Sequence, residues 1–125
     1  MHVRHAFLLL AAAVVAVGCS SSAGVSPRQE IRLGVAAARR GYWQEAVFRF
    51  ERARVARPGD AQLLNNLAVA QEALGRYDDA LATYKAALER APSNTAIKRN
   101  YARFAEFFSS YARGVRPKKD ADATP

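Results

Sequence analysis

Residues 60–92 read DAQLLNNLAVAQEALGRYDDALATYKAALERAP, and this stretch predicts two amphipathic helices of similar length. In each half, apolar residues recur at the i, i+3, i+4, i+7 spacing that places them on one face of a helix. Gly75 lies between the halves, where a helix can end and turn, and Pro92 follows the second half, where a helix cannot continue. One such hairpin cannot bury its own apolar face, so we expect a second hairpin beside it.

A second hairpin with the same pattern lies directly upstream. Residues 27–60 align with residues 61–94 without a gap when the chain is shifted by 34 positions. The aligned pairs are Leu33 and Leu67, Gly34 and Ala68, Gly41 and Gly75, Trp43 and Tyr77, Ala46 and Ala80, Phe50 and Tyr84, Ala53 and Ala87, and Pro58 and Pro92. We expect the small residues to let helices approach closely and the aromatic residues Phe50 and Tyr84 to fill the space between successive hairpins.

The period and the matched residue types resemble the tetratricopeptide repeat. The resemblance implies an all-α fold, a short right-handed α-α solenoid of two helix hairpins, residues 27–60 and 61–94. Ser26, Asp60 and Asn94 are favoured N-cap residues and predict where three of the helices begin.

A third copy of the pattern begins at Thr95 but is not followed by a second helix, so residues 95–113 are expected to form a capping helix. Its expected inward face consists of Ile97, Tyr101, Ala102, Ala105 and Phe108. Phe104, Phe107 and Tyr111 are then aromatic on faces that a capping helix normally makes polar. Residues 114–125 are short and polar and are expected to be disordered.

The amino terminus has the features of an export signal. A short basic start precedes an apolar run, Ala6–Val17, that is too short to span a bilayer comfortably, and Cys19 follows it. This arrangement resembles the lipobox of bacterial lipoproteins, although Ala16 stands where leucine is usual. The resemblance implies that residues 1–19 are a lipoprotein signal, that Cys19 carries lipid (palmitate among its acyl chains), and that residues 20–26 form a flexible tether. The alternative is an ordinary secretory peptide cleaved near Ala23, which would discard Cys19.

The location follows from the same resemblance. No acidic residue follows Cys19, and in Gram-negative lipoproteins an aspartate there causes retention at the inner membrane. We therefore expect a membrane-anchored protein of the bacterial cell envelope that faces the periplasm, at the outer membrane.

The sequence offers little for catalysis. His2 and His5 both lie in the predicted signal, and the chain has a single cysteine, so the common general bases, nucleophile pairs and zinc spacings are missing. Asp78 and Asp79 are the only adjacent carboxylates, and they lie where the backbone dipole of a helix favours acidic residues. We expect no enzyme activity, no metal site and no cofactor.

The resemblance also implies a concave groove lined by the first helix of each repeat. The expected groove residues are Arg28, Arg32, Arg39, Gln62, Asn65, Asn66, Val69, Glu72, Arg99, Asn100 and Arg103. Amides in the middle and arginines at both ends predict a partner segment with acidic ends and a neutral, extended middle. The alternative is that these arginines are merely solvated. A family subset clamps a terminal carboxylate, but only Asn66 matches that set, so no such clamp is predicted.

These observations predict a non-catalytic scaffold or adaptor that binds another envelope protein. The alternative is a structural subunit that self-associates through exposed solenoid ends, because two and a half repeats are fewer than such arrays generally need. The net charge of +8 is concentrated in the first repeat and in the cap and tail, and the first repeat could contact anionic lipid or glycan near the anchor. Nucleic acid is not expected as a partner, because an export signal is present and a base-reading module is missing.

Overall fold

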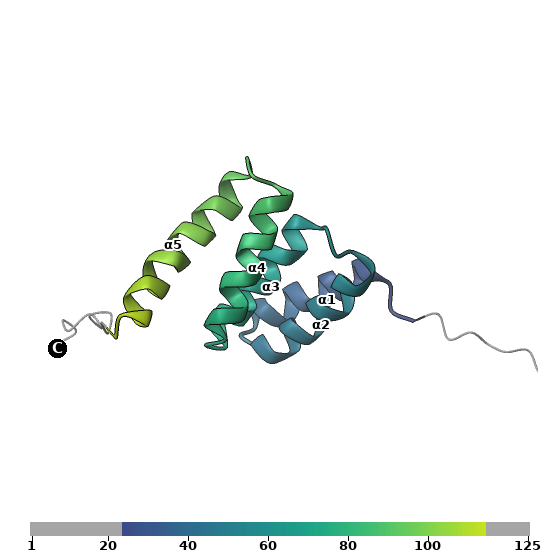
Figure 1. The fold of residues 1–125 in the computed structure, drawn as a ribbon. Helices are drawn as coiled ribbons and strands as arrows, with labels where there is room; N and C mark the ends of the chain where they lie inside the picture. The colour runs from purple at the N-terminus through teal and green to yellow at the C-terminus, as the bar shows by residue number, and fades with distance from the viewer. Residues whose placement is uncertain (1–23, 115–125) are drawn as a thin grey trace, which may run out of the picture.

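The computed structural model describes residues 24–114, and within that range the chain is entirely helical, with no strand. The five helices are α1 (Pro27–Arg39), α2 (Trp43–Ala56), α3 (Ala61–Ala73), α4 (Tyr77–Arg90) and α5 (Thr95–Ala112). Helices α1 and α2 form one hairpin, α3 and α4 form a second, and α5 packs against the second hairpin (Figure 1). The predicted all-α solenoid is confirmed. The signal, Cys19, most of the tether and the tail from residue 115 lie outside the described residues.

Short polar side chains begin three of the helices, as predicted. Ser26 Oγ accepts a hydrogen bond from the Gln29 amide at 3.3 Å, and Asp60 Oδ1 accepts one from the Leu63 amide at 3.0 Å. Asn94 Oδ1 accepts from two backbone amides of α5, each at 3.1 Å. Each cap satisfies backbone donors that a helix leaves free at its start. The caps therefore set the residues at which α1, α3 and α5 begin.

The core lies in the layers between helices, and the residues that match between repeats form much of it. Phe50, from α2, packs among residues of α1 and α3, whereas Tyr84, from α4, packs against α3 and α5. Gly34 leaves room for the Phe50 ring where α1 meets α2, because a Cβ atom there would lie 2.5 Å from Cε1 of Phe50. The predicted roles of these small and aromatic residues in packing are therefore confirmed.

Helix α5 corrects two expectations. Phe104 is fully buried, with its ring centroid 5.3 Å from that of Tyr84, so it is a core residue rather than an outward one. Phe107 is half-buried against Tyr77. Tyr111 remains 54% exposed, although it stacks on Phe107 and meets Tyr77 edge to face. Ala102, expected to face inward, is exposed. The position of Ala102 meets the second helix of a repeat, and none follows α5 among the described residues.

Candidate functional site

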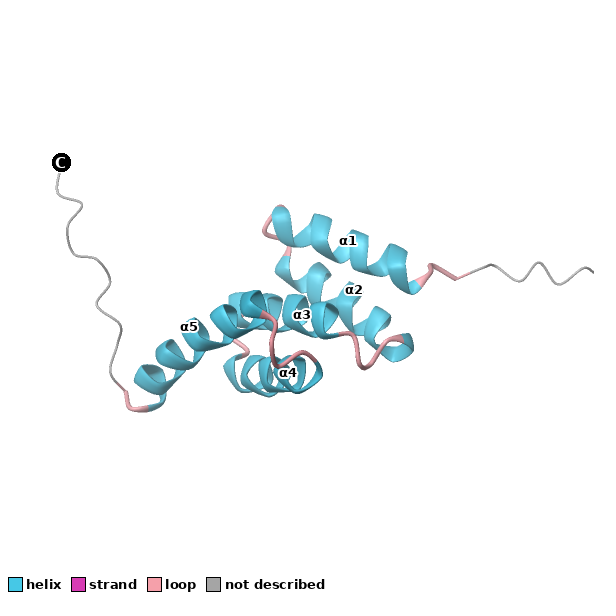
Figure 2. Cartoon of the chain, turned by 90° about the horizontal axis from the view of Figure 1, so that it is seen from above, coloured by secondary structure: helices cyan, strands magenta, loops and turns pink. Residues whose placement is uncertain are grey.

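The first helices of the repeats form a groove. Helix α3 lies between α1 and α5 and contacts both, whereas α1 and α5 do not contact each other (Figure 2). Two hollows adjoin along this surface and share Val69. We call the pair of hollows the groove, and we name each hollow after the aromatic residue that closes it.

The Trp43 pocket, of about 350 Å³, lies between α1, α3 and α5, with the start of α2 as a further wall. It is lined by Val35, Ala38, Arg39, Trp43, Asn65, Asn66, Val69 and Asn100. Two of its amides are bonded to each other: Asn100 Nδ2 donates to Asn65 Oδ1 at 3.1 Å. The third, Asn66, accepts at Oδ1 from Nε2 of Gln62, which lies outside the pocket, at 3.1 Å. Asn65 is buried, and its side-chain carbonyl joins α3 to α5, so it shapes the pocket. The apolar wall is the part of the pocket that remains open to a ligand.

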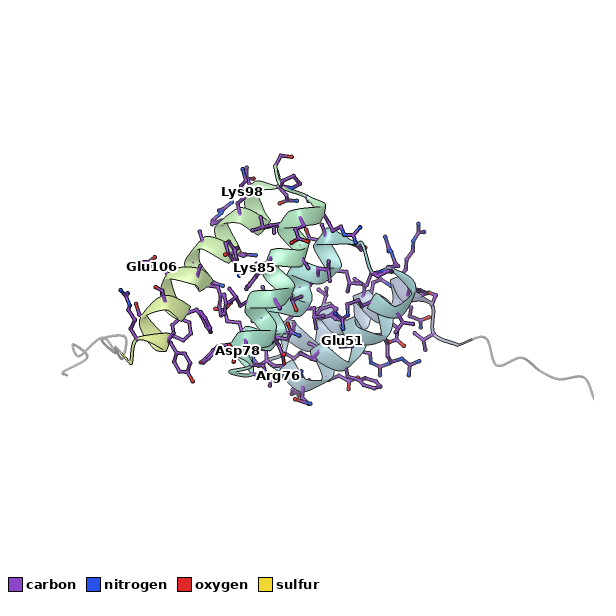
Figure 3. The ribbon with its side chains drawn as sticks, viewed as in Figure 1. Glu51, Arg76, Asp78, Lys85, Lys98 and Glu106 are labelled. Carbon is purple, nitrogen blue, oxygen red and sulfur yellow. The ribbon has the colours of Figure 1, made fainter. Side chains whose placement is uncertain are left out.

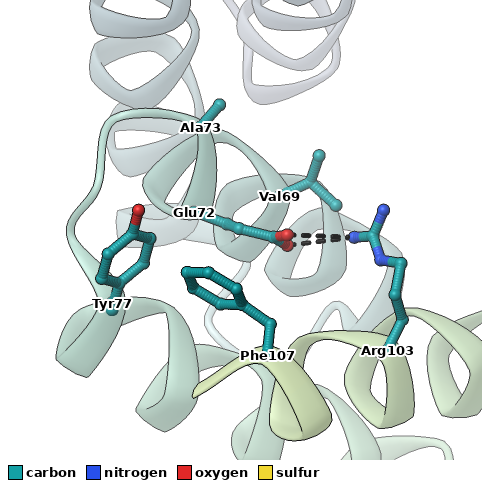
Figure 4. A pocket seen from close by; sticks show the side chains of 6 residues that line it. All are labelled: Val69, Glu72, Ala73, Tyr77, Arg103 and Phe107. Atoms are coloured by element: carbon teal, nitrogen blue, oxygen red, sulfur yellow. Dashed lines mark hydrogen bonds and ion pairs between the residues drawn. The ribbon is translucent and has the colours of Figure 1, made fainter. Parts of the chain in front are cut away.

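The Tyr77 pocket, of about 380 Å³, lies next to it, between α3, α4 and α5. It is lined by Val69, Glu72, Ala73, Tyr77, Arg103 and Phe107 (Figure 4). Arg103 donates to both carboxylate oxygens of Glu72, at 3.0 and 3.3 Å. The Tyr77 and Phe107 rings meet edge to face, with centroids 5.0 Å apart. An ion pair and an aromatic pair thus form opposite walls of this pocket.

Glu72 also connects the pocket to the core. The buried Tyr84 hydroxyl donates to Glu72 Oε2 at 2.9 Å, so one carboxylate on α3 holds a phenol of α4 and a guanidinium of α5. Burial, together with the negative charge of Glu72, raises the pKa of Tyr84 well above its ordinary value near 10. The phenol therefore stays protonated and remains a hydrogen-bond donor throughout the physiological pH range.

Comparison with protein families decides the assignment: the family model described as tetratricopeptide repeat matches residues 31–95, more than half of the chain. The chain belongs to the tetratricopeptide repeat family. Repeats of this family are generally scaffolds for protein–protein interaction. The groove described above is therefore the candidate surface for binding a protein partner.

A solved tetratricopeptide domain has the same fold. The chain is similar to the domain of Sgt2 from Aspergillus fumigatus, with a TM-score of 0.69 and 22% sequence identity. The match covers 82% of this chain and 70% of that one. At this identity the likeness concerns the fold alone. Among curated proteins, no relative was found.

The tetratricopeptide register places seven of the eleven expected groove residues in the walls of the two pockets. These are Arg39, Asn65, Asn66, Val69, Glu72, Asn100 and Arg103. The other four, Arg28, Arg32, Gln62 and Arg99, are exposed and line neither pocket. Whether any of the eleven contacts a partner stays a prediction.

Sequence reasoning missed Trp43 and Tyr77 as groove residues. Both occupy the first position of a second helix, and from the sequence they were identified only as an aligned pair of the two repeats. In the tetratricopeptide domain each instead forms a wall at the turn between the paired helices. The available signal was that a large aromatic residue stands in both repeats two positions after the turn glycine, Gly41 or Gly75.

Two further findings bear on the chemistry of the domain. Between residues 24 and 114, no group of three or more histidine, cysteine, aspartate or glutamate side chains is placed to hold a metal ion. Among the same residues, no helix combines the length and the apolar character needed to cross a membrane.

Proposed function

We propose that this protein is a non-catalytic scaffold or adaptor of the bacterial cell envelope that binds a partner segment in its groove. The observation that carries the proposal is the pair of open pockets on either side of Val69, formed by helices of two repeats and the capping helix. Family membership supports the same reading, because tetratricopeptide repeats generally serve as interaction scaffolds. The proposal assigns no cofactor and no metal.

The proposed location rests on the amino-terminal sequence. Cys19 carries the lipid, residues 20–26 act as the tether, and the domain faces the periplasm from the outer membrane. An extended tether of this length reaches about 25 Å at most, so the domain remains close to the membrane surface. A partner would accordingly be another envelope protein, not nucleic acid.

Photo-crosslinking in cells tests the groove. A photoreactive amino acid replaces Ala73, which is exposed and lines the Tyr77 pocket, and in a matched variant it replaces Ala82, an exposed alanine of α4 that lines neither pocket. We expect discrete crosslinked protein species from position 73 and few from position 82. The same species from both positions, or none from position 73, would contradict the groove as the binding surface.

Metabolic labelling tests the anchor. Radiolabelled palmitate should be incorporated into the wild-type protein and lost in Cys19→Ala, with Ser20→Ala as the control that keeps the cysteine. Fractionation of the two membranes would then place the labelled protein. Unlabelled wild-type protein in the soluble periplasmic fraction would favour the secretory alternative.

Self-association is a second candidate function, and it is favoured by apolar exposure on the first hairpin. Leu33 is 40% exposed, Phe48 50% and Val55 86%. Light scattering over a range of protein concentrations separates the candidates, because a scaffold that works through its groove should remain a monomer. An oligomer that Phe48→Asp or Val55→Asp dissociates, and that Lys85→Asp leaves intact, would support the structural subunit instead.

A further inference from the structure

The two edges of the groove differ in charge. Helix α1 carries Arg28, Arg32 and Arg39 on one stripe, because the spacing of an α-helix brings these positions within about 60° of Val35, which lines the Trp43 pocket. All three arginines are exposed, and none forms an ion pair with another described residue. The only acidic residue of α1, Glu30, is buried. This edge therefore presents uncompensated positive charge over about 16 Å.

The edge formed by α5 is different. Arg103 is already occupied, since its guanidinium donates to Glu72 across the Tyr77 pocket. The carboxylate of Glu72 fills the place that an acidic ligand would take on Arg103. Of the two arginines expected on this edge, Arg99 is the one that forms no ion pair with a described residue. The sequence expectation of acidic groups at both ends of a ligand therefore does not fit this geometry.

The Trp43 pocket lies beside the arginine stripe and is open to an apolar group. Val35, Ala38, Trp43 and Val69 supply its apolar wall, while the amides of Asn65 and Asn100 are already bonded to each other. An inserted apolar side chain would gain burial while the hydrogen bond between those two amides is kept. Arg39 lines the same pocket, so the apolar site and the positive edge are continuous.

We infer that the groove takes a peptide segment that is acidic at one end only: carboxylates lie along Arg28, Arg32 and Arg39, and an adjacent apolar side chain fills the Trp43 pocket. The Tyr77 pocket then faces an uncharged part of the segment, since Glu72 and Arg103 neutralise each other. This inference rests on the proposed function and adds the chemistry and polarity of the partner. Complementarity between the positive edge and the carboxylates sets the orientation in which the segment binds.

The chain carries its own reporter for the test, because Trp43 is its only tryptophan and lines the pocket. The protein, purified with its native amino terminus in mild detergent, is titrated with a synthetic peptide of about ten residues. The peptide has three glutamates, one each for Arg28, Arg32 and Arg39, followed by a leucine. A control peptide has lysines in place of the glutamates. We expect a saturable change in tryptophan emission with the glutamate peptide, weakened by added salt, and none with the lysine peptide.

Charge-reversed variants locate the site. Arg28→Glu/Arg32→Glu/Arg39→Glu should weaken the glutamate peptide by about tenfold or more, because each exposed pair is worth up to about fivefold. Arg40→Glu, about 100° around α1 from Arg39, and Arg99→Glu on α5 should each change the affinity by less than about twofold. All variants should keep the helical circular dichroism of the wild type, since these side chains are exposed.

Three results would overturn the inference: no saturable binding, equal binding of the two peptides, or a triple variant that binds like the wild type. If position 73 still captures partners in cells while the glutamate peptide fails, the proposed function stands and only the chemistry assigned to the partner is wrong. If position 73 captures nothing, the proposed function fails whatever the peptide does.

Discussion

Glu30 in the first hairpin and Leu64 in the second occupy the same repeat position, and both side chains are buried. Glu30 Oε2 accepts a hydrogen bond from Arg49 at 3.1 Å, and its Oε1 lies 2.8 Å from Arg52 Nε. In the second hairpin the positions of those two arginines hold Thr83 and Ala86, and Ala86 packs near Leu64.

At this position the first hairpin therefore joins its two helices by ion pairs, and the second joins them by apolar contacts. Thr83 Oγ1 donates to the Asp79 carbonyl of its own helix at 2.8 Å, so it needs no partner from α3. The difference shows that one buried repeat position can be filled either by a charged side chain with its partners or by an apolar one. The two arginines that pair with Glu30 also lie over the Phe48 ring, each with its Cζ atom 5.5 Å from the ring centroid. Figure 3 draws the side chains along the described chain, with Glu51 labelled on the same helix.

The largest expected difference between the hairpins is in the loss of stability when equivalent leucines are substituted, and it comes from the position of each hairpin in the solenoid. Leu33 and Leu67 are the same residue at the same repeat position, but Leu67 is 0% exposed and Leu33 40%, because a hairpin precedes only the second of them among the described residues. We expect Leu67→Ala to lower the free energy of unfolding by about 3 kcal/mol and Leu33→Ala by less than about 1 kcal/mol. Urea unfolding followed by circular dichroism measures both.

Equal costs for the two leucine substitutions would be informative. They would mean that Leu33 is covered in the folded protein, either by a second copy of the chain or by residues outside the described range. Repeating the measurement at several protein concentrations would separate a second copy from the chain's own residues, because only association depends on concentration.

The buried carboxylate gives the next effect. Glu30→Ala leaves Arg49 and Arg52 without their partner, but both arginines are partly exposed and can turn toward water, so we expect a loss of about 2 kcal/mol rather than the larger cost of a fully buried pair. Glu30→Leu/Arg49→Thr/Arg52→Ala copies the second hairpin and should recover most of that loss. If the triple variant were as unstable as Glu30→Ala, ion pairing would be essential to the first hairpin.

The close approach of α1 and α2 gives a smaller effect. Gly34→Ala places a Cβ atom against the buried Phe50 ring, which has little room to move, so we expect a loss of about 1.5 kcal/mol despite the better helix propensity of alanine. The second hairpin already has Ala68 at this position, and Ala68→Gly is the matched change. Stabilisation by Gly34→Ala in a urea titration would show that the Phe50 ring yields, and that the glycine is not needed there.

The fold could be predicted from the sequence because its signals are local or periodic. The N-caps at Asp60 and Asn94 depend on atoms within three residues, and the repeat supplies the register of everything between them. The burial of Glu30 could not be predicted, because it requires two arginines from the next helix to arrive at the right rotation. Phe104 was placed outward by analogy with a polar cap, whereas α5 packs on aromatic rings of α4.

The groove could be predicted only in outline. Repeat positions placed Arg39 and Val69 correctly on its walls, since those positions follow from helix register. The pairing of Glu72 with Arg103 joins residues of two helices across the groove, and it depends on how α5 crosses α3. A sequence pattern carries no signal for that crossing, which is why both ends of the groove seemed equally free to bind an acid.

Tyr84 and Phe50 complete the comparison of the hairpins, because they share a repeat position and differ by one hydroxyl group. The Tyr84 hydroxyl donates to Glu72, which also keeps its bonds to Arg103, so Tyr84→Phe should cost only about 1 kcal/mol at neutral pH.

At alkaline pH the hydrogen bond from Tyr84 to Glu72 should show itself in the pH dependence of stability. The pKa of Tyr84 is raised in the folded state, so its contribution to stability is complete below the unfolded value near 10 and declines as the pH rises above it. We expect the free energy of unfolding, from urea titrations at pH 8 to 11, to fall more steeply above pH 10 in the wild type than in Tyr84→Phe. Parallel curves would mean that the phenol is not buried against Glu72 in solution.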